Sequence, residues 1–297
     1  MRFLPVPVAA CCLFVITAPV LGQDMPVTQV LIDGEDWEMV ADGYGFTEGP
    51  AVDATGNVFF SDPKNHRIYR AGIDGKVTLF AENTQKTSGL MFGPDGRLYG
   101  CSRAGGRIAA WDRDGSAETV VEVDDCNDLV VGSDGSIYFT DPTNQRVCYV
   151  SPNRQKKVVA EGFTPNGIIL WPQEGTLVVT DRSQPHLWTF RIELDGSLSS
   201  KERYYMPLQL DRNRDRPGSD GMTVDSKNRL YVATYAGIQM FDPTGRLGGT
   251  ILKPQRRFLS NITFGGPDFS YLYATCTDKV YRRRVKPVGV PYFRRAE

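Results

Sequence analysis

The segment Ser133-Asp-Gly-Ser-Ile-Tyr-Phe-Thr-Asp141 decides the fold, because variants of it recur along the chain. Each copy joins a tight turn to a short run of β-branched and aromatic residues, which is typical of a β-hairpin. The turn residues that anchor the copies are separated by 40, 39, 40, 53 and 42 residues, and they are Gly56, Gly96, Gly135, Gly175, Asn228 and Ser270. Six such repeats predict an all-β, six-bladed β-propeller; a β-sandwich would not require the repeat.

The two ends of the repeat region predict how the ring closes. Trp37–Asp42 resembles the fourth strand of other repeats, such as 157–162, yet it precedes the first repeat. The last repeat ends after its third strand, Val280–Val285. We therefore expect the N-terminal strand to complete the last blade and to remove an open sheet edge. The extra length before Asn228 falls in the Arg-rich segment Lys201–Pro217, which we predict to be a loop insertion.

The first residues resemble a secretory signal. Arg2 is followed by an apolar stretch, Phe3–Leu21, and by the small residue Gly22 at a suitable cleavage position. The alternative is a membrane anchor, but three prolines within the stretch argue against a stable spanning helix. We therefore predict a signal peptide at 1–22, a single propeller domain at 23–297, and a secreted or periplasmic protein without a stable membrane anchor.

Composition excludes several classes of protein. The 34 Lys and Arg residues nearly balance the 35 Asp and Glu residues, whereas a nucleic-acid-binding domain usually shows a basic excess. No GxSxG, P-loop, HExxH or GxGxxG motif is present. Outside the signal, Cys101, Cys126, Cys148 and Cys276 match no zinc-ribbon or CxxC spacing, and the sequence leaves their pairing open. Nothing indicates a protein partner.

An oxygen-bearing residue stands eight or nine positions before each turn anchor: Glu48, Ser88, Asn127, Asn166, Asp220 and Asn261. Equivalent positions of a propeller lie at equal height around the axis, so we expect these side chains to converge at one mouth of the central channel. Such a ring suits a hard cation, and two carboxylates would neutralise a divalent ion. The alternative is a ring of polar residues that holds only water.

A second ring follows from the same chain direction. The residues after the second strand of each repeat should face the same mouth, and they are Asp62, Ser102, Asp141, Asp181, Thr234 and Cys276. His66 and His186 lie in the loops that follow, and they are the only imidazoles available for acid–base chemistry. Alternatively, both histidines are loop residues without a chemical role.

Four motifs together resemble the regucalcin/gluconolactonase family. They are Phe46-Thr-Glu48-Gly-Pro50, Asn127–Val131 with Ser133–Pro142, Pro165-Asn166-Gly167, and Ser219-Asp220-Gly221-Met222. The resemblance covers nearly all of the chain after the signal. It implies a six-bladed propeller with one divalent metal at the channel mouth, whose ligands correspond to Glu48, Asn166 and Asp220. It also implies that Asn127 is a further ligand or a substrate contact.

One position departs from the family pattern. Members often carry a basic residue two positions before the equivalent of Asn127, where this chain has Asp125. A carboxylate there would repel an acidic substrate or pair with another group. The candidate substrate contacts are Asn127, Asp125, Asp141, His66 and His186.

The resulting expectation is a gluconolactonase-like, metal-dependent hydrolase of a sugar lactone or related ester. The cation, Ca²⁺ before Zn²⁺, Mn²⁺ or Mg²⁺, would polarise the carbonyl while Asp220 acts as general base, with His66 or His186 in reserve. Two alternatives remain open. One is a non-catalytic, metal-stabilised propeller that binds a ligand or protein partner, and the other is a phosphotriesterase or arylesterase.

Overall fold

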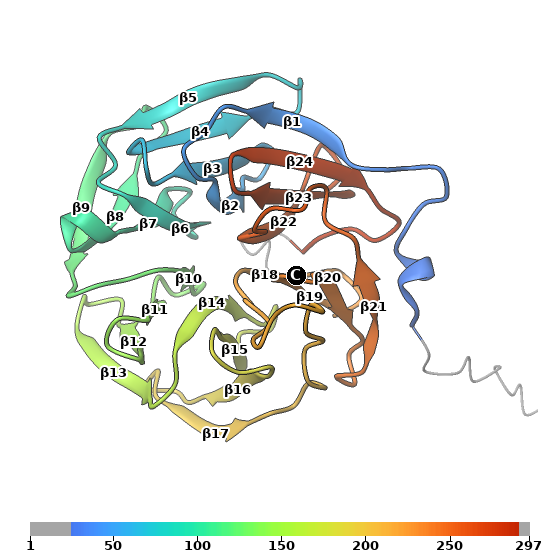
Figure 1. Cartoon of the computed structure of the whole chain (residues 1–297). Coiled ribbons are helices and arrows are strands. Elements are labelled where there is room, and N and C mark those ends of the chain that lie inside the picture. Colours follow the sequence, from blue (N-terminus) through green and yellow to red (C-terminus); the bar gives the residue numbers. More distant parts are fainter. Residues whose placement is uncertain (1–24, 291–297) are drawn as a thin grey trace, which may run out of the picture.

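Residues 25–290 are described by a computed structural model, and they form six four-stranded antiparallel sheets arranged around a central axis (Figure 1). This confirms the predicted six-bladed propeller. The signal predicted at 1–22 lies outside the described residues. In the described part, the helical elements are the 3₁₀ turns η1 (Val27–Gln29) and η2 (Arg103–Gly105), and no helix is long and apolar enough to cross a membrane.

The first five blades follow the chain from the axis outward. Blade 1 consists of β2 (Glu48–Val52), β3 (Val58–Asp62), β4 (Arg67–Ala71) and β5 (Val77–Glu82). Blade 2 consists of β6 (Thr87–Phe92), β7 (Leu98–Ser102), β8 (Arg107–Trp111) and β9 (Ala117–Glu122). Blade 3 consists of β10 (Leu129–Val131), β11 (Ile137–Asp141), β12 (Arg146–Val150) and β13 (Lys156–Glu161), and blade 4 consists of β14 (Pro165–Leu170), β15 (Thr176–Asp181), β16 (Leu187–Ile192) and β17 (Leu198–Glu202). Blade 5 consists of β18 (Met222–Val224), β19 (Leu230–Thr234), β20 (Gly237–Phe241) and β21 (Leu247–Ile251).

Blade 6 joins the two ends of the described chain, as the sequence predicts. It contains β22 (Asn261–Gly265), β23 (Tyr271–Cys276), β24 (Lys279–Arg284) and, as its outermost strand, β1 (Glu38–Asp42). β1 runs antiparallel to β24, and Glu38 lies opposite Arg282. The Arg282 Nε donates to Glu38 Oε2 at 2.7 Å. The closing strand therefore covers the edge that β24 would otherwise expose.

The core lies between the blades. The innermost strand β2 is buried along most of its length, whereas the outermost strand β9 is exposed or only partly buried. Aromatic rings fill the spaces between neighbouring blades. Phe59 and Phe92 approach edge to face at 5.1 Å between blades 1 and 2, and Tyr231 and Phe264 do so at 5.4 Å between blades 5 and 6.

The predicted turns are present at the end of the ring opposite the channel mouth. Asn228 is one of their left-handed residues, with φ of 58°. Asp225 stabilises this turn by accepting hydrogen bonds from the Lys227 N–H and from the buried Arg229 Nε. In blades 4 and 6 the left-handed residue stands one position before the predicted anchor, at Glu174 and Phe269. The repeat therefore locates each turn to within one residue.

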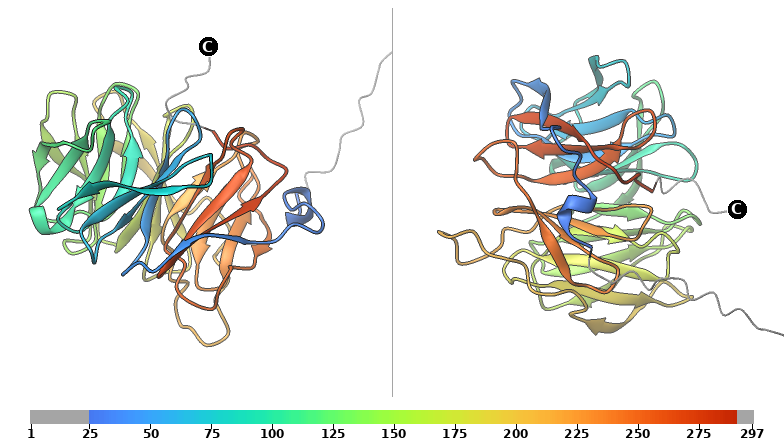
Figure 2. Two further views of the ribbon diagram at one scale, coloured as in Figure 1. Left: turned by 90° about the horizontal axis from the view of Figure 1, so that it is seen from above. Right: turned by 90° about the vertical axis from the view of Figure 1, so that its right-hand side faces the viewer.

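The insertion between β17 and β18 is the loop that the sequence predicts, here residues 203–221, and its golden ribbon projects from one face of the ring in Figure 2. It is attached to the blades beneath it. The Leu208 N–H donates to the Pro185 carbonyl at 2.8 Å, and the side chains of Tyr205 and Leu208 are buried. Because loops that follow the outermost strands lie at the channel mouth, this insertion forms part of the mouth.

Candidate active site

The first residues of the innermost strands gather at the mouth because small residues follow them. A Cβ atom on Gly221 would lie 1.8 Å from the Asn261 side chain, and a Cβ on Gly89 would lie 2.2 Å from Asp128 Oδ1. Gly49 and Gly167 would clash in the same way with the backbone of the next blade. Glycine at these positions lets the innermost strands approach closely and leaves room for the polar side chains of the adjacent blade.

Three buried carboxylates meet at the mouth, those of Glu48, Asp128 and Asp220, with exposed fractions of 7%, 8% and 5%. The Asn261 side chain lies beside the Glu48 and Asp128 carboxylates, and its amide oxygen accepts a hydrogen bond from the Ile262 N–H at 2.8 Å. The Asn166 side chain lies beside Asp220. The structure therefore brings together three of the four predicted metal ligands, and it adds Asp128 and Asn261 beside them.

Burial raises the pKa of each carboxyl group. It raises the pKa of Glu48 to about 7 and that of Asp128 to about 8, and Glu48 adds to the shift at Asp128. Burial also raises the pKa of Asp220, with Glu48 and Asp128 contributing repulsion. Among the described residues, none of the three carboxylates forms a salt bridge with Lys or Arg. Buried negative charge without such a partner favours a bound cation.

The donor atoms fit a hard cation. Carboxylate and amide oxygens of Glu48, Asn166 and Asp220 surround the mouth, and neither sulfur nor imidazole is among them. Within residues 25–290, no group of three or more His, Cys, Asp and Glu side chains is arranged to hold a metal by itself. A metal site here must therefore include amide oxygens, as the ring predicted from the repeat does.

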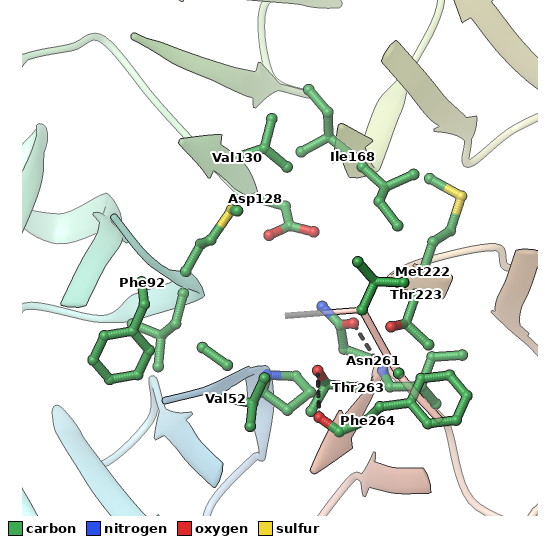
Figure 3. Close-up of a pocket in the computed structure, with 18 of the residues that line it drawn as sticks. Val52, Phe92, Asp128, Val130, Ile168, Met222, Thr223, Asn261, Thr263 and Phe264 are labelled. Carbon is green, nitrogen blue, oxygen red and sulfur yellow. Dashed lines mark hydrogen bonds between the residues drawn. The ribbon is translucent and has the colours of Figure 1, made fainter. Parts of the chain in front are cut away.

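Sequence reasoning missed Asp128. Figure 3 shows its carboxylate pointing into the central pocket from the start of β10, while Asn261 enters from the β22 side. The signal was available, because Glu48, Ser88, Asn166 and Asp220 are all followed by glycine whereas Asn127 is followed by Asp128. At the position where four blades have no side chain, blade 3 has a carboxylate.

Asp125, which stands where family members often carry a basic residue, pairs with another group, and this is one of the two outcomes that the sequence left open. Its carboxylate accepts hydrogen bonds from Arg103 Nε and Nη2, both at 3.1 Å, and from Thr143 Oγ1 at 2.5 Å. The Arg103 guanidinium also lowers the pKa of Glu48, although burial outweighs this effect. Asp125 therefore positions the guanidinium of Arg103 near the mouth. The neighbouring Asn127 is partly exposed, and it is the most open of the predicted ligands.

The carboxylates of the second predicted ring hydrogen-bond to nearby loop residues. Asp141 is fully buried, and its Oδ2 accepts hydrogen bonds from Asn144 Nδ2 at 2.8 Å and Arg146 Nε at 2.9 Å. Asp62 likewise accepts from the backbone N–H groups of Gly45 and Phe46. These contacts account for the two carboxylates without a substrate. Asp141 is thus not open to a ligand in this structure.

The structure does not bring either histidine to the three carboxylates. His66 is a partly exposed turn residue with φ of 55°. His186 is buried directly before β16 of blade 4, and its ring meets Trp188 edge to face at 4.9 Å. Burial and, to a lesser extent, the nearby Arg203 lower the pKa of His186, which favours the neutral imidazole. The described cysteines, Cys101, Cys126, Cys148 and Cys276, are buried free thiols.

Fold and site together define a β-propeller with an acidic and amide-lined channel mouth. Residues 46–278 match the family model described as SMP-30/gluconolactonase/LRE-like region, and the protein belongs to this family. The chain is similar to the gluconolactonase of Zymomonas mobilis, with 26% identity over 294 residues covering 85% of this chain and 82% of the relative. The relatives thus support assignment to a family of lactone hydrolases.

Solved structures give the same answer for the fold. A gluconolactonase from Xanthomonas campestris superimposes with a TM-score of 0.75 and 25% identity, covering 85% of this chain and 90% of that one. A calcium-binding regucalcin from Agrobacterium tumefaciens has a TM-score of 0.72 and 16% identity, with coverages of 88% and 98%. The second likeness concerns the fold alone.

Proposed function

We propose that the protein is a metal-dependent lactonase that opens a sugar lactone or a related cyclic ester at the channel mouth. One observation carries the proposal: three buried carboxylates, none of which forms a salt bridge within residues 25–290, lie beside the side chains of Asn166 and Asn261 at the mouth. The lactonase names of the relatives support the type of reaction.

Each residue at the mouth has a proposed task. Glu48, Asn166 and Asp220, with Asn127, would hold a divalent cation, whose chemistry is to polarise a lactone carbonyl. The Asp220 carboxylate accepts a proton from the water that attacks this carbonyl, and it returns the proton to the alkoxide released when the ring opens. The partly exposed Asn127 amide donates a hydrogen bond to the substrate. Water therefore adds across the ester bond without net change in the protein.

The oxygen donors favour Ca²⁺ over softer ions. Lactone hydrolysis by the purified protein should stop on addition of a chelator and return when one ion is restored, with Ca²⁺ compared against Mg²⁺, Mn²⁺ and Zn²⁺. An ion that raises the melting temperature without any hydrolysis would favour the non-catalytic, ligand-binding propeller. Hydrolysis of aryl esters or phosphotriesters but not of lactones would favour the esterase alternatives.

We also propose that the protein is exported after cleavage near Gln23. The proposal rests on the apolar segment that precedes this residue. Intact-mass measurement on protein from the native host should give a chain that begins near Gln23 outside the cytoplasm. A retained Met1 in a cytosolic fraction would refute it.

A further inference from the structure

Arg103 is fixed at the mouth but remains accessible. Its Nε and Nη2 both donate to Asp125, whose side chain is 15% exposed, and Thr143 Oγ1 donates to the same carboxylate. The Arg103 side chain itself is 41% exposed. Within the described residues its Nη1 donates no hydrogen bond. A guanidinium held in this way presents free donors in a defined direction.

Arg103 lies close to the proposed reaction site. It follows β7 directly, at the end of that strand that reaches the mouth, and its partner Asp125 stands two residues before Asn127. The exposed Arg182 follows β15 in the same way, directly after Asp181. Two arginines from different blades thus stand at the mouth end of the ring.

The opposite side of the mouth is aromatic. Phe46 and Phe258 stack at 6.3 Å with an interplanar angle of 16°, and Tyr235 meets Phe258 at 5.5 Å. All three rings are partly exposed, and we call them the aromatic platform. Phe46 comes two residues before Glu48, and Phe258 comes three before Asn261, so the platform adjoins the site. Lys64 and Arg214 lie over the rings of Phe46 and Tyr235.

We infer that the substrate is a ring lactone that also carries an anionic group. The ring would lie on the aromatic platform, and the anion would meet the free donors of Arg103. This inference rests on the proposed function and names the substrate class for the same site. The exposed side chains of Arg182, Lys64 and Arg214 add positive charge at the mouth, which favours an anionic ligand. Asp125 supports such binding, because it orients Arg103 instead of facing the substrate.

A matched pair of lactones tests the inference. D-Glucono-1,4-lactone and D-glucaro-1,4-lactone share one ring and differ by a hydroxymethyl group against a carboxylate. The metal-loaded protein should prefer the anionic lactone in kcat/KM by about tenfold or more, the ratio expected for one charge-assisted hydrogen bond. The preference should shrink between about 0.01 M and about 1 M salt, where the Debye length falls from about 30 Å to about 3 Å.

Two arginine variants distinguish a specific contact of Arg103 from the loss of any exposed positive charge. Arg103→Gln should lower the anionic-to-neutral ratio of kcat/KM about tenfold, because the charge is lost while polar donors remain. Arg67→Gln is the control: it removes an exposed arginine paired with Glu82 at the same end of the ring, and it should leave the ratio unchanged. Equal use of the two lactones by the unmutated protein would overturn the inference, as would a ratio that Arg103→Gln does not move.

A binding measurement distinguishes this inference from the proposed function. Calorimetry with the ring-opened acids, glucarate and gluconate, requires no catalysis. If neither lactone is hydrolysed, the proposed function fails, yet tighter binding of glucarate that is lost in Arg103→Gln still supports the anion site. If the lactones are hydrolysed but the two acids bind equally, the function stands and the anion site is refuted.

Discussion

The two ends of the central channel are built by the same six innermost strands, yet they differ in chemistry. At the mouth the strands begin with carboxylates and amides, represented by Glu48 and Asn166. A few residues further along, the same strands line an apolar pocket, and Figure 3 labels Val52, Phe92 and Met222 among the residues around it. Asp128 and Asn261 lie at the boundary between the two regions.

At the far end, the last described residues of the chain are attached to the turns of blades 5 and 6. The Ser226 N–H donates to the Val288 carbonyl, and the Gly289 N–H donates to the Phe269 carbonyl. Val290 lines the pocket beside them. The mouth, in contrast, is bordered by loops that carry partly exposed residues such as Asn127 and Phe46. One end of the channel therefore serves stability, and the other end combines buried charge with access for a ligand.

Asp220→Asn gives the largest expected effect, because it keeps an oxygen ligand and removes the proposed base. Lactonase activity should fall about 10²–10⁴-fold and stay low at saturating metal. The rate is measured against metal concentration, with Asp124→Asn as a control that removes an exposed carboxylate at the same end. Full recovery at high metal would reduce Asp220 to a plain ligand and leave the base role to another group.

Phe264→Ala should lower the stability of the protein at the end of the channel opposite the mouth, without affecting the metal site. Phe264 is 3% exposed and packs against Tyr231, so its removal should cost about 3–5 kcal/mol in the free energy of unfolding. Urea denaturation measures this loss, and the apparent metal affinity of the folded protein should not change. Leu194→Ala, at a fully exposed apolar residue, is the control and should change stability by less than about 0.5 kcal/mol. A loss of metal affinity in Phe264→Ala would contradict the separation of the two ends.

Glu48→Gln should have opposite effects with and without metal. Without metal the variant should be at least as stable as the parent, because a buried charge is replaced by a neutral group of equal size. A metal at 100 times its dissociation constant stabilises by about 2.7 kcal/mol, and much of this gain should disappear. Melting temperatures with and without metal measure both effects. The exposed Glu82→Gln is the control, and an undiminished metal-induced shift in Glu48→Gln would remove Glu48 from the site.

Asn127→Ala should give the smallest effect. Its amide is a single partly exposed contact, so the loss should be about 0.5–1.5 kcal/mol in transition-state stabilisation. Raising substrate or metal should recover part of the activity, because Asp220 remains intact. Steady-state kinetics at several metal concentrations measure this. A loss as large as that of Asp220→Asn, unresponsive to both additions, would give Asn127 a different role.

Much of this molecule follows from the sequence. The repeat of turns fixes six blades, and Trp37–Asp42 predicts the closing strand, because both are local patterns that the chain displays without tertiary contacts. The periodic positions of Glu48, Asn166 and Asp220 also predict that these side chains meet, since repeats of equal length place equivalent residues at equal height.

Tertiary structure decides what the polar residues do after they meet. Asp141 and Asp125 both lie near the mouth, but their partners differ. Asp141 accepts hydrogen bonds from Asn144 and Arg146, whereas Asp125 orients Arg103. Asp128 enters the site only because Gly89 of the adjacent blade leaves room for its carboxylate. The repeat fixes the height and direction of each side chain, whereas burial and charge depend on neighbours from other blades, which are far away in sequence.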